Sequence, residues 1–296
     1  MKIHSKRVRP VIIGMVTIFA FSLLFGASRV SAQEQVAYQP SGFSAFEQFS
    51  GSETSQGQLM IQDTDLGYNF NEHVGLDIGV PVWEVHETFP GQPHRWNTGI
   101  GDPYADLRLT FLNPYLNYST VATVAVPAEE TGAFSTGRLG LDWFNHFDHS
   151  FGRLTPFADG GISNGIIDTR LLSQPFRLVQ SFRTLGFLAD VEGGMGFRVA
   201  NRMSIGGSYY ALLPSGSQKA FNGITNFFLT PAATVGNNTL SNITHDRGYS
   251  AWIRVSPASF FYIEPAYVHS LKLNDDAVTL TVGVDVRKMF TRGSSN

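Results

Sequence analysis

Apolar and polar residues alternate along this chain with a period of two, and this pattern constrains the fold more than any other feature. The clearest example is AVTLTVGVDVRKMF (277–290), whose apolar face carries Val278, Leu280, Val282, Val284 and Val286. Successive side chains of a strand point to opposite faces, so each such segment predicts a strand with one apolar face. The pattern recurs about every 20 residues, and no stretch keeps helical periodicity between helix caps. The sequence therefore predicts an all-β protein.

The predicted strands are joined by connections of alternating length. Short turns, as at 71–72 and 113–114, alternate with longer connections, as at 85–100 and 214–246. An even number of strands with tight turns at one end and long loops at the other is typical of a transmembrane antiparallel up-and-down β-barrel. The sequence predicts about 12 strands, at 42–50, 58–70, 73–84, 101–112, 115–126, 136–147, 154–163, 185–199, 202–213, 247–256, 260–270 and 277–290.

A soluble barrel or sandwich, with its apolar face inward, is the alternative to a membrane barrel. Aromatic residues favour the membrane barrel because they lie at strand ends beside the short turns, where an interfacial girdle is found; Tyr68, Phe111, Phe147 and Phe197 are examples. The last predicted strand also ends on Phe290, which resembles the terminal aromatic residue of outer-membrane barrels, although the tail TRGSSN follows it.

The first 32 residues have the three parts of a secretory signal peptide. A basic head precedes the apolar run 11–27, and VSA (30–32) supplies small residues for cleavage. An uncleaved anchor helix is the alternative, because the 17 residues of that run just reach across a bilayer. We expect a signal peptide at 1–32, an N-terminal segment with a first strand and loop at 33–57, the barrel at 58–290 and a short tail at 291–296.

Charge and cysteine content exclude several classes of function. Removing residues 1–32, which hold five Lys and Arg and no Asp or Glu, changes the formal net charge from −3 to −8. A nucleic-acid partner requires a clustered basic face, so we expect none. The chain has no cysteine and therefore forms neither a disulfide framework nor a thiolate metal site.

The stretch TGIGDPYADLRLTF (98–111) joins a glycine-rich turn to an alternating segment. It does not fit a nucleotide-binding site, because Pro103 and a strand follow the glycines where that site needs a helix. We expect Leu107 to face lipid, and Asp106 and Arg108 to face the interior of the barrel. The candidate lumen-lining residues chosen in this way are Asp77, Asp106, Arg108, Arg138, Asp142, Asp190, Glu192, Arg198, Arg254, Glu264, Asp285 and Arg287. We expect the arginines of this set to pair with its acids across strands.

The segment 214–246 is unusually apolar for an exposed loop. Phe221, Phe227 and Phe228 are candidates for a constriction or an apolar binding surface at the mouth of the barrel, because an apolar loop tends to bury itself. Packing against the outer rims of neighbouring strands is the alternative.

An outer-membrane lipid hydrolase is a further hypothesis, and it requires a serine activated by a histidine. His245 and Ser250 meet only if a loop brings them together, and the neighbours His269 and Ser270 point to opposite faces of a strand. We therefore predict a protein that is not an enzyme and has no catalytic residues.

A calcium site is suggested by Asp63 and Asp65, whose oxygen ligands suit Ca²⁺. The twelve-residue ligand loop with its terminal glutamate is missing, and alternation places both carboxylates on one strand face. A charged row facing the lumen is the preferred interpretation, and we predict no metal and no cofactor.

Four segments resemble a family of outer-membrane barrels associated with the meta-pathway degradation of phenol and related aromatics. They are VGLDIGVPVWEV (74–85), TGIGDPYADLRLTF (98–111), TVATVAVPAEETGAF (120–134) and TGRLGLDW (136–143). The sequence departs from the family pattern in its AEETG loop and in the long segment 214–246. The resemblance implies a barrel that admits small hydrophobic or aromatic molecules, and it implies no catalytic residues.

The sequence thus predicts a passive channel or transporter for small molecules in a bacterial outer membrane. Its expected partners are outer-membrane lipid, a small-molecule solute and the barrel-insertion machinery. A closed structural barrel without transport is the alternative, because a barrel of about 12 strands is narrow enough for long side chains to fill it.

Overall fold

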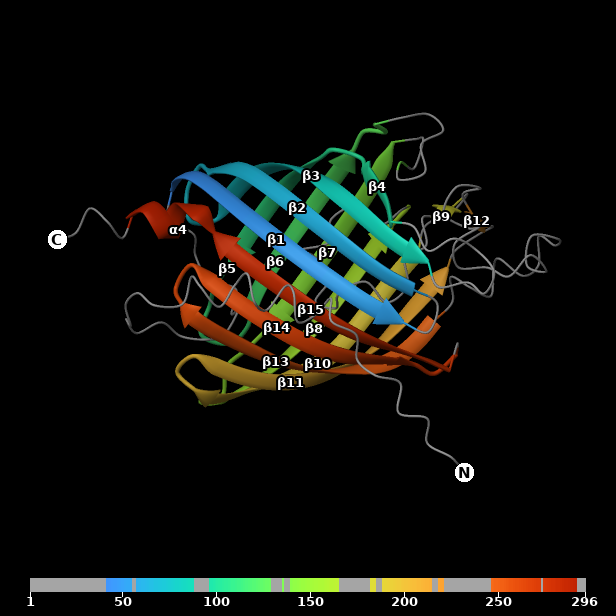
Figure 1. Ribbon diagram of the computed structural model, residues 1–296. Helices are drawn as coiled ribbons and strands as arrows, with labels where there is room; N and C mark the ends of the chain where they lie inside the picture. The colour runs from blue at the N-terminus through green and yellow to red at the C-terminus, as the bar shows by residue number, and fades with distance from the viewer. Residues whose placement is uncertain are drawn as a thin grey trace, which may run out of the picture.

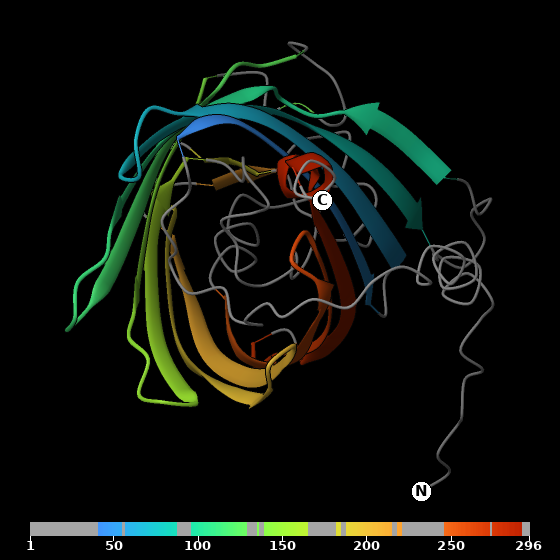
Figure 2. The same cartoon turned by 90° about the vertical axis from the view of Figure 1, so that its left-hand side faces the viewer.

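The protein forms a closed antiparallel β-barrel (Figures 1 and 2). The computed structural model describes residues 41–54, 57–87, 96–128, 135, 139–164, 182–184, 188–214, 218–220, 246–272 and 274–291. Each strand pairs with its neighbours in sequence, and the first strand pairs with the last over the register Phe46↔Asp285 to Glu53↔Val278. This last pairing closes the sheet into a barrel, which is the form that a spanning sheet takes in lipid.

Twelve strands make up the barrel when β4 and β5, which pair in succession with β3, are counted as one. The strands are β1 (Gly42–Thr54), β2 (Gly57–Asn69), β3 (Val74–Glu87), β4 (Trp96–Ile100), β5 (Tyr104–Phe111), β6 (Asn117–Ala125), β7 (Gly140–Asp148), β8 (Leu154–Ser163), β10 (Leu188–Ala200), β11 (Met203–Pro214), β13 (Asp246–Ala258), β14 (Phe261–Ser270) and β15 (Asp275–Asp285). A separate two-stranded sheet joins β9 (Phe182–Thr184) to β12 (Gln218–Ala220). The predicted up-and-down barrel of twelve strands is confirmed.

The short turns lie together at one end of the barrel, where β1 also starts and β15 also ends. Backbone hydrogen bonds close these turns, as between the amide of Phe70 and the carbonyl of Val74, or the amide of Phe151 and the carbonyl of Leu154. At the other end, the connection between β1 and β2 is shorter than the sequence suggested. Its flanking strands run to Thr54 and from Gly57 and pair along their whole length.

The last strand is also shorter than its alternation predicts. It ends at Asp285, and Val286–Thr291 form the short helix α4, which lies at the short-turn end of the barrel (Figure 2). The carboxylate of Asp285 accepts a hydrogen bond from the backbone amide of Lys288. It also forms an ion pair with the ammonium group of Lys288 at 2.8 Å. A side-chain acceptor of this kind at a helix start satisfies an amide that has no helical partner. Arg287 and Phe290 therefore belong to a helix and not to a strand.

The outer surface of the barrel is apolar and the inner surface is polar. In β5, Leu107 and Phe111 are exposed on the outside, whereas Asp106 and Thr110 are buried on the inside. The same alternation continues around the sheet, so that the residues buried inside include Thr123 of β6 and Thr279 of β15. No helix in the described part of the chain is long and apolar enough to span a membrane.

Aromatic rings lie on the outer surface at the short-turn ends of β2, β5, β6 and β7. The rings of Phe111, Tyr118 and Phe147 stack in series, with centroids 6.1 Å and 4.8 Å apart. Tyr68 and Phe70 make an edge contact at 5.5 Å beside the turn between β2 and β3. This arrangement matches the girdle that marks the edge of the apolar band in membrane barrels.

Candidate functional site

The polar inner surface of the barrel is the candidate functional site, and Tyr104 organises one part of it. Its hydroxyl lies 2.9 Å and 3.0 Å from the two carboxylate oxygens of Asp63 and 3.2 Å from Oδ1 of Asp65. All three side chains are almost completely buried. Because Tyr104 belongs to β5 and both acids to β2, the contact crosses the intervening strand β3.

Arg108 and two acids lie next to this group. The guanidinium of Arg108 donates to the side-chain oxygen of Asn69 at 2.6 Å and lies 3.5 Å from the carboxylate of Asp77. Asp106 sits directly opposite Asp77 in the register and accepts a hydrogen bond from the hydroxyl of Thr123. Two like charges in opposite positions destabilise a sheet unless other groups compensate them. Arg108 and Thr123 provide that compensation.

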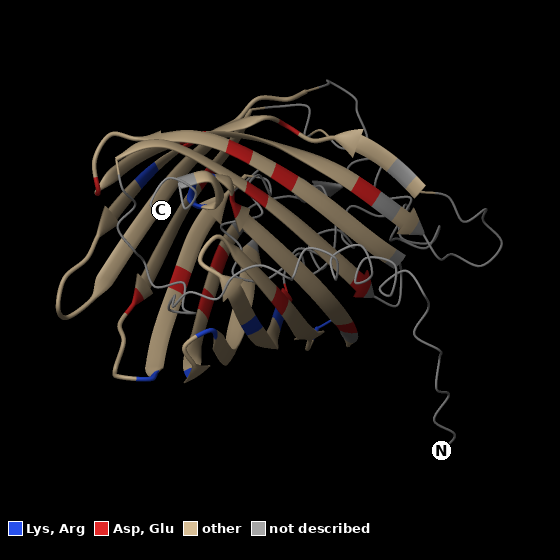
Figure 3. Ribbon diagram, turned by 60° about the vertical axis from the view of Figure 1, so that its left-hand side comes forward, with Lys and Arg blue, Asp and Glu red and all other residues tan. Residues whose placement is uncertain are grey.

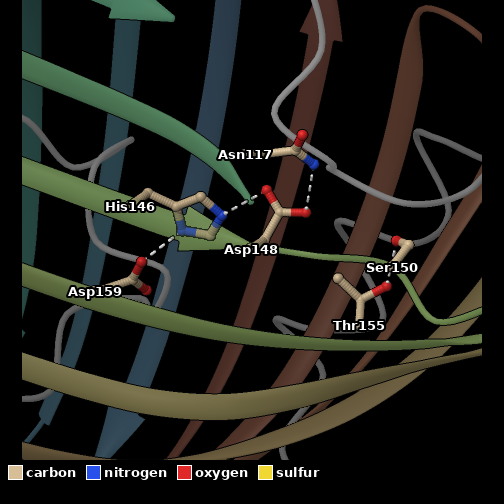
Figure 4. A network of polar contacts seen from close by, with 6 residues as sticks. All are labelled: Asn117, His146, Asp148, Ser150, Thr155 and Asp159. Carbon is tan, nitrogen blue, oxygen red and sulfur yellow. Dashed lines mark hydrogen bonds and ion pairs between the residues drawn. The ribbon is translucent and has the colours of Figure 1, made fainter. Parts of the chain in front are cut away.

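A second polar group surrounds His146 near the short-turn end (Figure 4). Its Nδ1 lies 2.5 Å from the carboxylate of Asp159 and its Nε2 lies 3.6 Å from that of Asp148. The side-chain amide of Asn117 donates to the other oxygen of Asp148 at 3.2 Å. The ring of Phe157 stacks on the imidazole with centroids 6.2 Å apart. The group thus places one imidazole between two buried carboxylates on adjacent strands.

Arg254 and Glu264 form an ion pair across β13 and β14. The guanidinium Nε lies 2.5 Å from a carboxylate oxygen of Glu264, and the cation also lies 4.7 Å from the centre of the Tyr262 ring. The hydroxyl of Tyr262 reaches Gln48 on β1 at 3.3 Å, which crosses β15. This is the predicted pairing of an arginine with an acid, and it is joined to an aromatic ring.

A third polar group lies at the long-loop end. The carboxylate of Asp246 accepts hydrogen bonds from the hydroxyls of Tyr210 at 3.0 Å and Ser270 at 2.6 Å. The hydroxyl of Ser250 lies 2.7 Å from that of Ser208, and both are buried. His245, the histidine considered for a hydrolase with Ser250, lies outside the described residues.

His269 and Ser270 face opposite sides of the barrel wall, as alternation predicts. The imidazole of His269 lies on the outer side, 2.7 Å from the carboxylate of Asp276 and 5.1 Å, between ring centres, from Tyr249. Ser270 points inward to Asp246. The two side chains therefore do not form a nucleophile and base pair.

Most predicted lumen-lining residues of the described chain lie on the inner face. Asp77, Asp106, Glu192 and Glu264 are buried there, while Asp142, Asp190, Arg108 and Arg254 are half-buried. Three others lie at the short-turn end: Arg198 donates to the carbonyl of Gly152, Arg287 to the carbonyl of Ser41, and Asp285 caps α4. Arg138, Phe221, Phe227 and Phe228 lie outside the described residues.

The arginines of this set have different roles. In the described part of the chain, Arg108 and Arg254 lie against interior acids, whereas the contacts of Arg198 and Arg287 are with backbone carbonyls at the short-turn end. The pairing expected for all of the arginines is thus seen for those two.

Several interior residues were missed by the sequence reasoning. His146, Asp148, Asp159 and Asp246 all point inward and are bonded to one another or to tyrosine and serine hydroxyls. Asp148 is the last residue of β7, whereas Asp159 lies in the middle of β8, and alternation places both on the polar face. Asp148 and Asp246 lie one residue beyond the predicted strands 136–147 and 247–256, whereas His146 and Asp159 lie within predicted strands, where alternation alone identifies them.

Inward aromatic rings lie flat on glycines of the next strand. In five cases the ring and the glycine are direct register partners, and a Cβ added to the glycine would overlap the ring. The pairs are Tyr104 with Gly79, Phe157 with Gly194, Tyr210 with Gly248, Trp252 with Gly206 and Tyr262 with Gly283. Because glycine lacks a side chain, each ring covers its partner's backbone and lies along the wall.

The interior carries far more acidic than basic groups. Ten Asp and Glu residues are buried in the described part of the chain, and no Lys or Arg is. Figure 3 shows acidic residues along the strands, whereas Lys and Arg lie mostly near strand ends. Among the described residues, no group of three or more His, Asp or Glu side chains could hold a metal ion.

Comparison with known proteins supports the fold. No protein-family model and no curated protein matches this chain. The COG4313 outer membrane channel from Pseudomonas putida F1 is similar with a TM-score of 0.55 and 10% sequence identity, over 86% of this chain and 98% of that one. The KdgM porin solved with disordered oligogalacturonate has a TM-score of 0.44 at 6% identity, over 81% and 98% of the two chains. A FadL homologue from Pseudomonas aeruginosa has 0.43 at 9% identity, over 82% and 75%.

The first of these similarities, together with the closed sheet and its apolar outer face, identifies the architecture. The chain has the fold of an outer-membrane β-barrel channel.

Proposed function

We propose that this protein is a passive channel for small molecules in a bacterial outer membrane. The observation that carries the proposal is the polar inner face, which runs the length of the barrel inside an apolar outer face. Polar side chains occupy the short-turn end at Asp148, the middle at Asp106 and the long-loop end at Asp246. A barrel needs a polar interior of this kind when hydrophilic groups must pass through lipid.

The dimensions of the strands support a position in the membrane. The shortest uninterrupted strands, such as β6 and β7, have nine residues, and the longest have thirteen or fourteen. A tilted strand needs about 9–11 residues to cross the hydrocarbon layer. The proposed partners are therefore outer-membrane lipid, a small-molecule solute and the machinery that inserts such barrels.

Aromatic and other hydrophobic molecules are the proposed solute class. The sequence resemblance to barrels of phenol degradation supports this class, and so do the rings on the inner wall. Phe157, Trp252 and Tyr262 present flat apolar surface among the polar groups of the interior. A planar solute gains from stacking on such rings while its polar substituents bond to neighbouring carboxylates and hydroxyls.

A closed barrel without transport is the second candidate function. It is favoured by the close packing of some interior side chains, since Tyr104 and Tyr210 are only 4% and 1% exposed. Side chains that pack against one another inside a narrow barrel leave little room for a solute.

Single-channel recording of the purified, refolded protein separates the two candidates. Discrete conductance steps are expected from a channel, while a folded barrel that conducts no current supports the closed barrel. Heat-modifiable electrophoretic mobility reports folding in the same sample. Swelling of proteoliposomes with phenol-like solutes and with sugars of similar size then tests the solute class, and faster entry of the aromatic solutes is expected.

The proposed channel is not an enzyme. The buried hydroxyl of Ser250 lies 2.7 Å from that of Ser208. Phospholipid hydrolysis in detergent provides the test, and we expect the same background rate for the native protein and for Ser250→Ala. Hydrolysis that disappears in the variant would establish an enzymatic role.

A further inference from the structure

The interior charge of the barrel is strongly negative and is distributed over most of its wall. The buried carboxylates come from many strands, including Asp63 on β2, Asp159 on β8, Glu192 on β10, Asp246 on β13 and Glu264 on β14. In the described part of the chain no Lys or Arg side chain is buried in return. The imbalance is therefore shared by many strands of the described inner surface and is not confined to one cluster.

Five inward residues that are successive register partners form one belt of polar side chains across adjacent strands of the wall. Asp77 on β3 lies opposite Asp106 on β5, Thr123 on β6 follows, and Asp142 on β7 lies opposite Thr123. Ser163 on β8 continues the belt opposite Asp142. Three carboxylates thus occur on five adjacent strands at one level, with hydroxyl groups between them.

The inward basic groups do not neutralise this surface. Among the described residues, Arg108 lies 3.5 Å from the carboxylate of Asp77, and Arg254 forms an ion pair with Glu264. Other cations are directed elsewhere: Arg202 donates to the carbonyl of Pro257 at a short turn, and Lys288 pairs with Asp285 at α4. The described interior keeps a net negative charge even when His146 is counted as a cation.

Two buried carboxylates near the short-turn end provide independent support. Oδ2 of Asp159 accepts no hydrogen bond from the described residues, and Oδ1 of Asp148 has only the imidazole Nε2 of His146, at 3.6 Å and beyond hydrogen-bond distance, beside it among them. Both side chains are 1% exposed, and they belong to the group that points into the barrel beside His146 (Figure 4). A buried carboxylate oxygen without a donor is costly, so it favours a cation or a donor group arriving from the lumen.

We infer that the interior selects for cationic solutes, inorganic cations and organic amines, over anionic ones. The inference rests on the proposed channel function, because selectivity requires passage. A passage lined by one sign of charge within low-dielectric walls concentrates counter-ions and repels co-ions. Rings of Asp and Glu produce cation preference in other pores by the same physics. The inward aromatic rings add favourable contacts for an organic cation.

The test is the zero-current potential of the refolded protein in a planar bilayer under a KCl gradient. We expect a zero-current potential whose sign indicates preference for potassium, with a permeability ratio of potassium to chloride above about threefold. A conducting protein that prefers chloride, or that discriminates neither ion, overturns the inference and leaves the channel function standing. A folded protein without conductance overturns both.

Charge variants make the test specific to named residues. Asp148→Asn combined with Asp159→Asn should lower the permeability ratio by about twofold or more, since two interior charges are removed. Asp142→Asn changes a half-buried residue of the belt and should lower the permeability ratio by a smaller factor. This single variant replaces the double variant in the test if the double variant does not fold. The matched control is Glu72→Gln, which removes one negative charge from an exposed turn at the short-turn end.

A solute assay gives a second readout of the same inference. Proteoliposomes that contain the native protein should swell faster in lysine than in glutamate, which are similar in size and opposite in net charge. The difference should shrink in the Asp148→Asn and Asp159→Asn double variant and persist in Glu72→Gln. Equal swelling rates for the two amino acids in the native protein would contradict cation selection.

Discussion

The hydroxyl of Tyr104 lies within 3.0 Å of both carboxylate oxygens of Asp63, although the two residues are separated by a complete strand. The ring passes over Gly79 of β3, which has no side chain to block it. The contact therefore ties β5 to β2 without the backbone ladder. Tyr262 makes a similar contact across Gly283, from β14 to Gln48 on β1.

Removing the Tyr104 hydroxyl should destabilise the barrel. Tyr104→Phe removes a hydrogen-bond donor from the buried Asp63 carboxylate, and a hydrogen bond to a charged group contributes about 1.5–3 kcal/mol. Guanidinium-induced unfolding in detergent, followed by tryptophan fluorescence, measures the loss. Tyr115→Phe is the control, because Tyr115 is 86% exposed in a turn. Equal stabilities for the two variants would show that the contact across β3 contributes nothing.

Adding a methyl group at Gly206 should move a ring away from the wall and into the lumen. Its Cβ would overlap the ring of Trp252, which then has to turn toward the centre of the barrel. Single-channel conductance of Gly206→Ala should be lower than that of the native protein, with folding shown by heat-modifiable mobility. Gly193→Ala is the matched control, because a Cβ there meets no other atom within 4 Å. A native conductance in Gly206→Ala would mean that the Trp252 ring does not limit the passage.

Removing Arg254 alone should lower the stability of the barrel more than removing the charges of both Arg254 and Glu264. Arg254→Ala removes the cation that pairs with the buried Glu264 carboxylate and should cost about 3 kcal/mol, the lower end of the range for buried pairs, because Arg254 is partly exposed. Adding Glu264→Gln to this variant should recover part of the loss. Unfolding free energies of the native protein and of the three variants form a double-mutant cycle, and a coupling energy near zero would contradict the prediction.

A charge on the outer face of β5 should oppose membrane insertion. Leu107 is 45% exposed in the apolar outer band, and arginine at the bilayer midplane costs about 2–4 kcal/mol in a barrel of this type. Leu107→Arg should therefore lower the folding yield into liposomes, as measured by heat-modifiable mobility. Leu116→Arg, at an exposed turn position beside β6, should fold with nearly native yield. Similar yields for both variants would show that Leu107 does not face lipid.

Local alternation predicts most strands of this barrel, but β4 (Trp96–Ile100) lies in the stretch 85–100, which was expected to be a connection. Segments such as Tyr104–Phe111 are apolar on every second residue, and a shift of one residue would turn all their charges toward lipid. The inner or outer position of Asp106 and Leu107 follows from that pattern alone. Even the short segment starting at 42 was identified, although its end at Thr54 was not.

The helix at the end of the chain was not predictable from the same pattern. Val286 and Phe290 continue the alternation of β15, and the six residues of α4 are too few for a helical period to emerge. Its start depends on the carboxylate of Asp285, which was interpreted as a residue of a strand that lines the lumen. A capping interaction of this type is visible only when the backbone path is known.

The contacts between interior side chains could also not be predicted from the sequence. Alternation places Tyr104, Asp63 and Gly79 on one face, but their contact depends on the register of three strands. The same is true of His146, which meets Asp159 only because β7 and β8 pair with those two residues opposite each other. Alternation predicts the inward side chains of most strands, whereas the strand register determines which of these side chains form hydrogen bonds.

The pairing of β1 with β15 makes this sheet circular in its connectivity. Every other strand pair joins neighbours in sequence, whereas this one joins Ser50 to Thr281, whose hydroxyls lie 3.4 Å apart. Arg287 also donates to the carbonyl of Ser41, which holds the two ends of the barrel segment together. A circularly permuted variant, in which a short linker joins these two ends and the chain starts in the turn between Ala200 and Met203, would preserve every strand pair of the barrel. The order of the strands around the barrel, and not the point at which the chain begins, is what this architecture requires.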